Sequence, residues 1–336
     1  MRKRVVVVRR LEEEHLVQLR QLFHVDYFDT LSSDNQEAYS QAMRRADGLI
    51  GAKLVITDEL LDESPHLKVI STISVGYDNL PLDELTRRGI LLCNTPDVLT
   101  ETTADTGFAL IMSTARRVVE LAELVKLGNW VGHIDKPLYG RDVHGKVLGI
   151  IGMGRIGAAV ARRGALGFGM RVLYSNSSPK LTLEKELGAQ RCDMDELLAQ
   201  SDFVCITVPL TPETYHLIGA EEFRKMKSSA ILVNIARGKV VDEKALIAAL
   251  VEGQLGGAGL DVFEEEPLSA KSQLLSMSNV VALPHIGSAT NETRAAMAQL
   301  AVDNLILTLK REAPKNAVNE HDLAAKHLTK PDFYIP

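Results

Sequence analysis

The sequence predicts an α/β protein with two parallel-sheet domains, one of them inserted into the other. A glycine-rich turn, Gly152-Met153-Gly154-Arg155-Ile156-Gly157, lies near the middle of the 336 residues. Segments typical of strands and helices alternate both before and after this turn, which is the pattern of parallel sheets covered by helices. The length also exceeds that of one ordinary hydrophobic core. We therefore expect the turn to open a second domain.

The first hundred residues alternate between short apolar runs and segments with helical spacing. We expect strands at 5–8, 25–28, 48–54 and 67–73. We expect helices at 11–23, 37–45, 58–63 and 82–88. A second series of strands is expected at 146–151, 170–174, 203–208, 230–234, 257–260 and 280–283.

Two longer helical segments separate the two series. One helix is expected at 101–127, with Thr100 as its N-cap and Gly128 as its stop. At about 1.5 Å per residue it would reach about 40 Å, enough to bridge two domains. A second helix, at 291–310, would lead back. We expect 1–100 and 289–336 to form a substrate domain and 101–288 a dinucleotide-binding domain, both Rossmann-like or flavodoxin-like, with the substrate in the cleft between them.

The glycine-rich turn has the context of a nucleotide site. An apolar run precedes it, and small residues and helix formers follow it at 155–168. In such a turn the first glycine permits the bend, the second lets the backbone approach a pyrophosphate, and the third lets helix and strand touch. The helix N-terminus adds free N–H groups and partial positive charge. We expect contacts to a dinucleotide from Gly152, Gly154, Arg155, Ile156 and Gly157.

The end of the next strand distinguishes between two cofactors. NAD-selective enzymes usually place Asp or Glu about 20 residues after the glycines, where it holds the ribose hydroxyls. Here that position is Ser175, followed by Asn176 and Ser177, with Lys180 further on. A carboxylate would repel the 2′-phosphate of NADP, whereas hydroxyls, an amide and an ammonium can donate to it. We expect these residues to bind NADPH in preference to NADH, although a polar loop without an arginine could serve either cofactor.

Composition excludes several kinds of partner. The formal net charge is −6, with no long basic run, so we expect neither nucleic acid nor membrane as a partner. Cys93, Cys192 and Cys205 have neither CxxC spacing nor an even count, which is typical of a reduced, cytoplasmic protein. We expect no metal site.

Three polar residues follow the later strands of the second series: Arg237, Glu266 and His285. Because ligands of open α/β sheets bind at the carboxyl ends of the strands, these residues can converge on one crevice. The types suit reduction of a 2-oxo acid. An imidazolium can protonate the oxygen that receives negative charge, a carboxylate can orient the ring, and a guanidinium can hold the substrate carboxylate. The alternative is an Arg–Glu surface pair beside an unrelated histidine.

Four motifs, at 207–214, 234–238, 259–267 and 284–290, resemble the D-isomer-specific 2-hydroxyacid dehydrogenases, and the resemblance covers nearly the whole chain. Residues 71–79 and 95–106 are most similar to the bacterial glyoxylate and hydroxypyruvate reductases of that family, also described as 2-ketogluconate reductases. The resemblance implies NADPH-preferring reduction of glyoxylate, hydroxypyruvate or 2-ketogluconate to D-2-hydroxy acids. It also implies a homodimer formed through the cofactor domain and an arm that contains Trp130 and Tyr139.

The same resemblance implies residue roles. Arg237, Glu266 and His285 would be catalytic. The substrate would be bound by Val75, Gly76, Tyr77, Arg237 and His285, with backbone amides around the first three holding its carboxylate. Asp261 would meet the nicotinamide end of the cofactor and Thr103 its phosphates or ribose. The further residues expected at the cofactor are Val208, Pro209, Thr214, Ile235, Ala236, His285 and Ser288.

Other activities use the same fold. Formate dehydrogenases usually carry glutamine where Glu266 stands, which counts against that activity. Phosphoglycerate dehydrogenases have a phosphate-binding surface and often a regulatory extension, whereas only a polar tail follows Pro314 here. NAD(H)-sensing co-repressors keep the fold and even the three catalytic residues, so a binding protein remains the alternative from another class.

Overall fold

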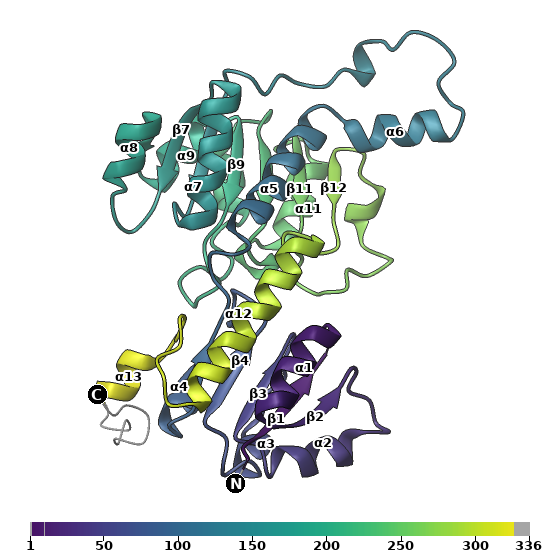
Figure 1. The fold of residues 1–336 in the computed structure, drawn as a ribbon. Helices are drawn as coiled ribbons and strands as arrows, with labels where there is room; N and C mark the ends of the chain where they lie inside the picture. Colours follow the sequence, from purple (N-terminus) through teal and green to yellow (C-terminus); the bar gives the residue numbers. More distant parts are fainter. Residues whose placement is uncertain (1, 10, 326–336) are drawn as a thin grey trace. The chain divides into compact units, whose positions relative to one another are not determined.

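A computed structural model describes residues 2–9 and 11–325, which form two compact units (Figure 1). Unit 1 holds the described residues up to Val98 and those from Thr290, and unit 2 is Leu99–Ala289. The end of the predicted 289–336 segment, residues 326–336, lies outside the described residues. The predicted α/β class is confirmed, since both sheets are parallel throughout the described strands.

Unit 1 contains a five-stranded sheet with the order β2-β1-β3-β4-β5. Its strands are β1 (Arg4–Val8), β2 (His24–Phe28), β3 (Gly48–Gly51), β4 (Val69–Thr72) and β5 (Leu91–Cys93). β5 was not predicted, because three residues are too few to show a periodicity. The alternation of strand side chains places Val6 and Val8 in one apolar cluster with Met43 and Leu85.

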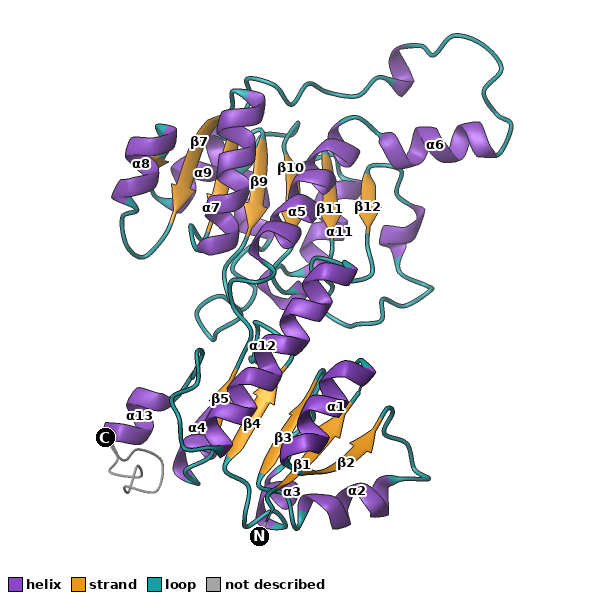
Figure 2. Cartoon of the chain, in the orientation of Figure 1, coloured by secondary structure: helices purple, strands orange, loops and turns teal. Residues whose placement is uncertain are grey.

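Helices cover both faces of this sheet. They are α1 (Glu13–Leu22), α2 (Gln36–Met43), α3 (Asp58–Asp62), α4 (Leu82–Arg87), α12 (Asn291–Leu309) and α13 (Glu320–Ala325). α1 and α12 contact each other, and α12 packs along β3 and β4 (Figure 2). The apolar cluster with Val6 and Val8 includes side chains of α2, α3 and α4. α12 is thus the segment by which the chain, after leaving unit 2, completes the core of unit 1.

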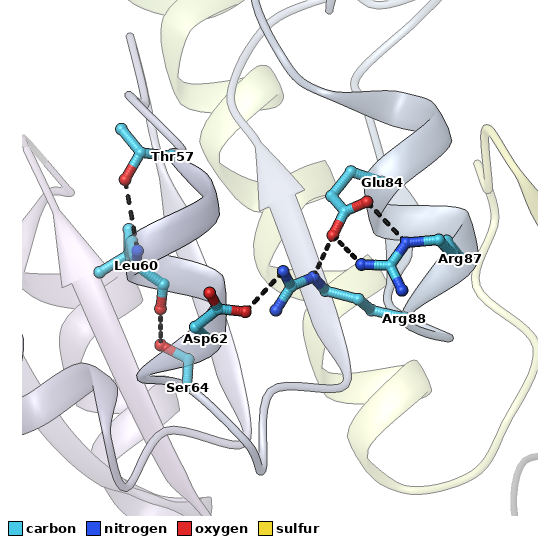
Figure 3. A network of polar contacts seen from close by, with 7 residues as sticks. All are labelled: Thr57, Leu60, Asp62, Ser64, Glu84, Arg87 and Arg88. Carbon is cyan, nitrogen blue, oxygen red and sulfur yellow. Dashed lines mark hydrogen bonds and ion pairs between the residues drawn. The ribbon is translucent and has the colours of Figure 1, made fainter.

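A surface network of charges joins α3 to α4 (Figure 3). Arg88 pairs with Asp62 at 2.7 Å and with Glu84 at 2.5 Å, and Nε of Arg87 donates to Glu84 at 2.8 Å. Because both guanidinium groups stabilise the ionised carboxylate, the pKa of Glu84 is lowered to about 2. Thr57 caps the start of α3 by accepting from the N–H of Leu60.

Unit 2 contains a seven-stranded sheet with the order β12-β11-β10-β9-β6-β7-β8. The strands are β6 (Val147–Ile151), β7 (Arg171–Ser175), β8 (Gln190–Arg191), β9 (Phe203–Ile206), β10 (Ile231–Asn234), β11 (Gly257–Leu260) and β12 (Val280–Ala282). From β6 the chain first adds β7 and β8 on one side of the sheet and then returns to add β9, β10, β11 and β12 on the other side, so the strand order reverses between β6 and β9. In open parallel sheets, ligands bind at the carboxyl ends of the strands beside such a reversal.

Helices pack on both faces of the second sheet as well. They are α5 (Thr100–Ala115), α7 (Arg155–Arg162), α8 (Leu181–Leu187), α9 (Met194–Gln200), α10 (Ala220–Lys225) and α11 (Glu243–Val251). One apolar cluster joins α5 and α7 to β6, and a second joins α9, α10 and α11 to the opposite face. The predicted helix at 155–168 consists of α7 as far as Arg162 and of a π-helical stretch at Arg163–Gly167 that follows it. Short 3₁₀ helices occur at Lys136–Leu138, Gly238–Val240 and Gln273–Ser276.

The single helix predicted at 101–127 is wrong. α5 ends at Ala115, Arg117 adopts a left-handed conformation with φ 55°, and a second helix, α6 (Val118–Lys126), follows. The helical spacing of apolar residues continues through the break, so this spacing could not predict where α5 ends. None of the residues of α6 is buried. α6 and the loop after it extend from the body of unit 2 as an arm (Figure 2).

In the described part of the chain, no helix is both long and apolar enough to cross a membrane.

Candidate active site

Three neighbouring strands of unit 2 lead into loops that carry the predicted catalytic residues. Arg237 follows β10, Glu266 follows β11 and His285 follows β12. β11 pairs with both β10 and β12, all in parallel, so their carboxyl ends meet at one edge of the sheet.

His285 and Glu266 form the central contact of the site. Nδ1 of His285 lies 2.8 Å from Oε2 of Glu266, and the N–H of Phe263 donates to Oε1 at 3.2 Å. Partial burial alone would raise the pKa of Glu266. The hydrogen bond and charge of His285, with smaller contributions from Phe263 and the Arg237 charge, lower that pKa overall. Since an ionised carboxylate only accepts, Nδ1 is the donor, which leaves Nε2 to exchange a proton with a substrate.

Arg237 is brought to this pair by the glycine that follows it. A methyl group on Gly238 would lie 1.8 Å from the carbonyl carbon of Phe263, so only glycine lets the two loops approach this closely. Nη1 of Arg237 donates to the carbonyl of Ala236 at 2.8 Å. Asn234 fixes the loop from inside, by donating to the carbonyl of Arg237 at 2.9 Å and accepting from the N–H of Ala236 at 3.0 Å.

Asp261 holds the turn that presents His285. Its two carboxylate oxygens accept from the N–H groups of Ile286 at 2.7 Å and Gly287 at 2.8 Å. Burial raises the pKa of Asp261, and these two hydrogen bonds only partly offset the increase. His285 has φ 55°, a left-handed conformation that is costly for a residue other than glycine. The Asp261 carboxylate therefore stabilises a strained turn at His285, a role that was not predicted.

The glycine turn lies where the strand order reverses. Gly152 has φ 95°, its carbonyl accepts from Oγ1 of Thr207 at 2.6 Å, and a methyl group on it would lie 2.7 Å from Val208. A methyl group on Gly157 would lie 2.3 Å from the carbonyl of Gly152. Packing therefore explains two of the three glycines.

Gly154 has no such explanation within the protein. It has φ −80°, which any residue adopts, and a methyl group there would meet no non-adjacent atom of the described residues within 4 Å. The space beside Gly154 lies at the N-terminus of α7, which begins at Arg155 and continues with Ile156. An open cradle at a helix N-terminus fits the pyrophosphate of a dinucleotide.

Several predicted cofactor residues have structural tasks in unit 2. Oγ1 of Thr214 donates to the carbonyl of Pro209 at 2.7 Å and accepts from the N–H of Thr211, which orders the loop after β9. Ile235 is buried against Gly107 of α5. Thr103, also on α5, is buried and lies beside Gly287 of the His285 turn. Val208 lies beside Gly152, Ala236 precedes Arg237, and Ser288 follows Gly287.

The loop after β7 lies against the glycine turn. Ser175 is the last residue of β7, and its carbonyl accepts from the N–H of Gly152 at 2.9 Å. Oδ1 of Asn176 accepts from the N–H of Met153 at 3.1 Å, so this side chain braces the turn. Arg191, which was not predicted, donates from Nε to the carbonyl of Asn176 and from Nη2 to that of Ser177, both at 3.2 Å. Its strand, β8, has two residues and no periodicity by which to find it.

In unit 1, the loop after β4 carries the predicted carboxylate-binding residues. The carbonyl of Val75 accepts from Asn94 at 2.9 Å, and that of Gly76 accepts from Oγ of Ser74 at 2.7 Å. Tyr77 follows, with 36% of its surface exposed. Among the described residues, no hydrogen bond engages the N–H groups of Val75 and Gly76. Two free amides on a fixed loop can receive an anion.

Comparison with known proteins identifies the family. The family model described as "D-isomer specific 2-hydroxyacid dehydrogenase, NAD binding domain" matches residues 108–287. Glyoxylate/hydroxypyruvate reductase B of Yersinia enterocolitica is 54% identical over 319 residues, which are 95% of this chain and 98% of that one. The chain belongs to the D-isomer-specific 2-hydroxyacid dehydrogenases.

Solved structures of 2-hydroxyacid dehydrogenases and other proteins share the architecture. A protein from Thermus thermophilus is 43% identical with a TM-score of 0.86, covering 94% of this chain and 99% of that one. An NADPH-dependent glyoxylate/hydroxypyruvate reductase from Sinorhizobium meliloti, solved with NADP and malonate, is 32% identical with a TM-score of 0.83, covering 95% and 97%. As a member of the 2-hydroxyacid dehydrogenases, the chain is an NAD(P)-dependent oxidoreductase.

Proposed function

We propose that this enzyme reduces glyoxylate to the achiral glycolate and hydroxypyruvate to its D-2-hydroxy acid, with 2-ketogluconate as a third candidate substrate and NADPH as the preferred reductant. The observation that carries the proposal is the 2.8 Å contact between His285 and Glu266 beside the Arg237 loop. The names of the 54% identical relatives support the choice of substrates.

Each residue has one task in the proposed reaction. The glycine turn and the loop after β7 would hold NADPH, which would supply the hydride for the reduction. Nε2 of His285 donates a proton to the carbonyl oxygen, and the Glu266 carboxylate holds the ring and stabilises its cationic form. The guanidinium of Arg237 and the N–H groups of Val75, Gly76 and Tyr77 bind the substrate carboxylate. Asp261 keeps the His285 turn in place.

The cofactor preference rests on the loop after β7. Ser175, Asn176 and Ser177 stand where NAD-selective enzymes place a carboxylate. Because these three side chains carry hydroxyls and an amide but no negative charge, they would not repel a 2′-phosphate. The similar reductase of Sinorhizobium meliloti is described as NADPH-dependent, which supports the same preference here.

We further propose a homodimer and a cytoplasmic location. The arm exposes apolar surface, with Val131 94%, Leu127 74%, Trp130 63% and Tyr139 56% exposed. Several exposed large apolar residues on one segment are typical of a protein interface. The location rests on the cysteine pattern, and Cys93, Cys192 and Cys205 are all free thiols in the structure.

A substrate panel tests the function directly. The purified enzyme is incubated with NADPH or NADH and with glyoxylate, hydroxypyruvate or 2-ketogluconate, and the configuration of the product is determined by chiral chromatography. We expect steady NADPH oxidation and a D-product from hydroxypyruvate.

Other outcomes identify the competing functions. Tight nicotinamide binding without turnover of any 2-oxo acid would identify a sensor and refute the proposal. A much higher kcat/KM with 3-phosphohydroxypyruvate than with hydroxypyruvate would identify a phosphoglycerate dehydrogenase. Turnover of formate would contradict the role of Glu266 as the partner of a proton donor.

A further inference from the structure

The predicted NADPH site lacks an arginine in the loop that follows β7. Residues 175–180 read Ser-Asn-Ser-Ser-Pro-Lys. A 2′-phosphate carries nearly two negative charges, and planar guanidinium groups bind such oxygens better than hydroxyls do. Sequence order alone therefore leaves the proposed NADPH preference with the ammonium of Lys180 but without a guanidinium.

The fold supplies a guanidinium from another strand. Arg191 is the last residue of β8, the edge strand, and pairs with Tyr174 near the carboxyl end of β7. Its guanidinium donates to the carbonyls of Asn176 and Ser177, so it lies against the loop that closes the nucleotide side of the sheet. The same loop contacts the glycine turn, because Asn176 accepts from the N–H of Met153.

We propose that Arg191 binds the 2′-phosphate of NADPH and replaces the arginine that the loop after β7 lacks. This inference rests on the proposed preference for NADPH and names the residue that would cause it. A guanidinium has five N–H donors, and two of them hold the loop carbonyls, so the group is fixed while further donors remain for phosphate oxygens.

Three neighbouring polar side chains, Asn176, Glu184 and Asp193, have hydrogen-bond partners of their own. Oδ1 of Asn176 accepts from the backbone, and its Nδ2 donates to the carbonyl of Ser178 at 3.0 Å. Glu184 accepts from the hydroxyl of Tyr174 at 2.5 Å, and Asp193 caps α9 by accepting from the N–H of Glu196. The two carboxylates thus have donors of their own, and the exposed Arg191 can face an incoming phosphate.

Binding measurements on the intact protein test the assignment without relying on turnover. The dissociation constants of NADP⁺, NAD⁺, 2′,5′-ADP and 5′-AMP are measured by calorimetry for the unmodified protein, Arg191→Gln and Arg191→Lys. Arg171→Gln is the matched control, because Arg171 is an exposed arginine at the opposite end of β7 and donates to Gln200. Circular dichroism and melting temperature verify that each variant is folded.

Loss of a charge-assisted hydrogen bond of this kind is expected to weaken binding by about 10- to 100-fold. Arg191→Gln should therefore weaken NADP⁺ and 2′,5′-ADP by about that factor while NAD⁺ and 5′-AMP change by less than about twofold. Arg191→Lys should lose part of the affinity, since it keeps the charge without the planar fork. Arg191→Gln should also flatten the salt dependence of 2′,5′-ADP binding.

The outcomes separate the two proposals. A preference for NADP⁺ that survives in both Arg191 variants overturns the assignment to Arg191 and leaves the cofactor proposal standing. Equal affinity of the unmodified protein for NADP⁺ and NAD⁺ overturns the cofactor preference, and this assignment with it. Equal losses for all four ligands would show that Arg191 only supports the loop, which also overturns the assignment.

Discussion

Single side chains carry the proposed chemistry. His285 has a carboxylate on one ring nitrogen, 2.8 Å away, and its backbone is held in a left-handed turn by Asp261. The proposed proton donor is therefore fixed by two different acidic residues, one through its ring and the other through the turn that follows it. Arg237 completes the site from the neighbouring loop.

Replacing the proton donor should remove most of the activity. We expect His285→Ala to lower kcat/KM for hydroxypyruvate reduction by about 10²- to 10⁴-fold, the usual contribution of general acid catalysis. Arg237→Ala should lower kcat/KM by a similar factor through lost substrate binding. Steady-state kinetics measure both, and His66→Ala, an exposed histidine of unit 1, is the control. Full activity of His285→Ala would refute the assigned donor.

Removing the Glu266 charge should move the pH profile. Because the pKa of Glu266 is lowered, this carboxyl is ionised at neutral pH and favours a cationic partner. In Glu266→Gln that anion is lost, so the decline of kcat/KM with rising pH should begin at a lower pH than in the unmodified enzyme. Profiles recorded from pH 5 to 9 show the shift. An unchanged profile with a uniformly lower rate would mean that Glu266 acts only by orienting the ring.

The same shift has a stability consequence with a definite sign. A carboxyl whose pKa is lowered on folding stabilises the native state above its ordinary pKa of 4.5, and this stabilisation is lost as the pH falls through the folded value. The difference in melting temperature between the unmodified protein and Glu266→Gln should therefore be larger at pH 7 than at pH 4. Thermal melts at the two pH values measure it.

Among single residues, the sequence could predict those that follow the ends of strands. Arg237, Glu266 and His285 could be placed at strand ends because each follows an apolar run that forms a strand of the sheet. Arg191 could not be found, since its role depends on which strand pairs beside β7. The use of Asp261 to hold backbone N–H groups also depends on a turn conformation that no residue pattern encodes.

Among the elements, two loops of unit 2 are fastened to each other beside the site. The N–H of Glu243 donates to Glu264 at 3.0 Å, and the N–H of Glu264 donates to Glu243 at 3.2 Å. Nε2 of His216 lies 2.8 Å from Oε1 of Glu264, and the N–H of His216 donates to the carbonyl of Lys239. This exchange joins the start of α11 and the loop after Arg237 to the segment that carries Glu266. We infer that it sets the spacing between the two.

Breaking this connection should impair catalysis indirectly. We expect Glu264→Ala to lower kcat/KM by about tenfold, because small misplacements of catalytic groups cost rate. Glu264→Gln, which retains an oxygen acceptor for the N–H of Glu243, should recover most of it. Glu265→Ala is the control, since Glu265 is the exposed neighbour. A Glu264→Ala enzyme with unaltered kcat and KM would show that the connection serves the fold alone.

Elements were predicted well where they are long or strongly apolar. The strands around the glycine turn match within one or two residues, since each is a continuous buried run. The break between α5 and α6 was missed because the left-handed conformation of Arg117 interrupts the backbone without interrupting the apolar spacing. β5 and β8 were missed because strands of three and two residues are defined by their partners.

At the scale of the whole molecule, the order of the strands in the second sheet separates the residues proposed to bind the cofactor from those proposed to act on the substrate. β6, β7 and β8, on one side of the reversal, hold the glycine turn and Arg191, whereas β10, β11 and β12 hold Arg237, Glu266 and His285. The sequence could predict two domains from the repeated alternation. It could not show this division within one sheet, which follows from the pairing of β6 with β9.

The arm makes the oligomeric state testable. Val125 and Leu127 are 52% and 74% exposed, and no residue of α6 is buried within the chain. If the arm packs on a second copy, light scattering should give twice the chain mass of 36.8 kDa for the unmodified protein and the single mass for Val125→Lys/Leu127→Lys. The charge would be buried unpaired in the dimer, which is costly, but remain hydrated in the monomer.

A matched substitution separates the interface from general effects of charge. Leu166→Lys replaces an apolar residue of unit 2 by lysine at a position that is 70% exposed but lies outside the arm, so this variant should remain dimeric. A single-chain mass for the unmodified protein at micromolar concentration would contradict the dimer. Dissociation of Leu166→Lys, with the arm variant intact, would place the interface elsewhere on unit 2, because an apolar surface stabilises association only where the second copy covers it.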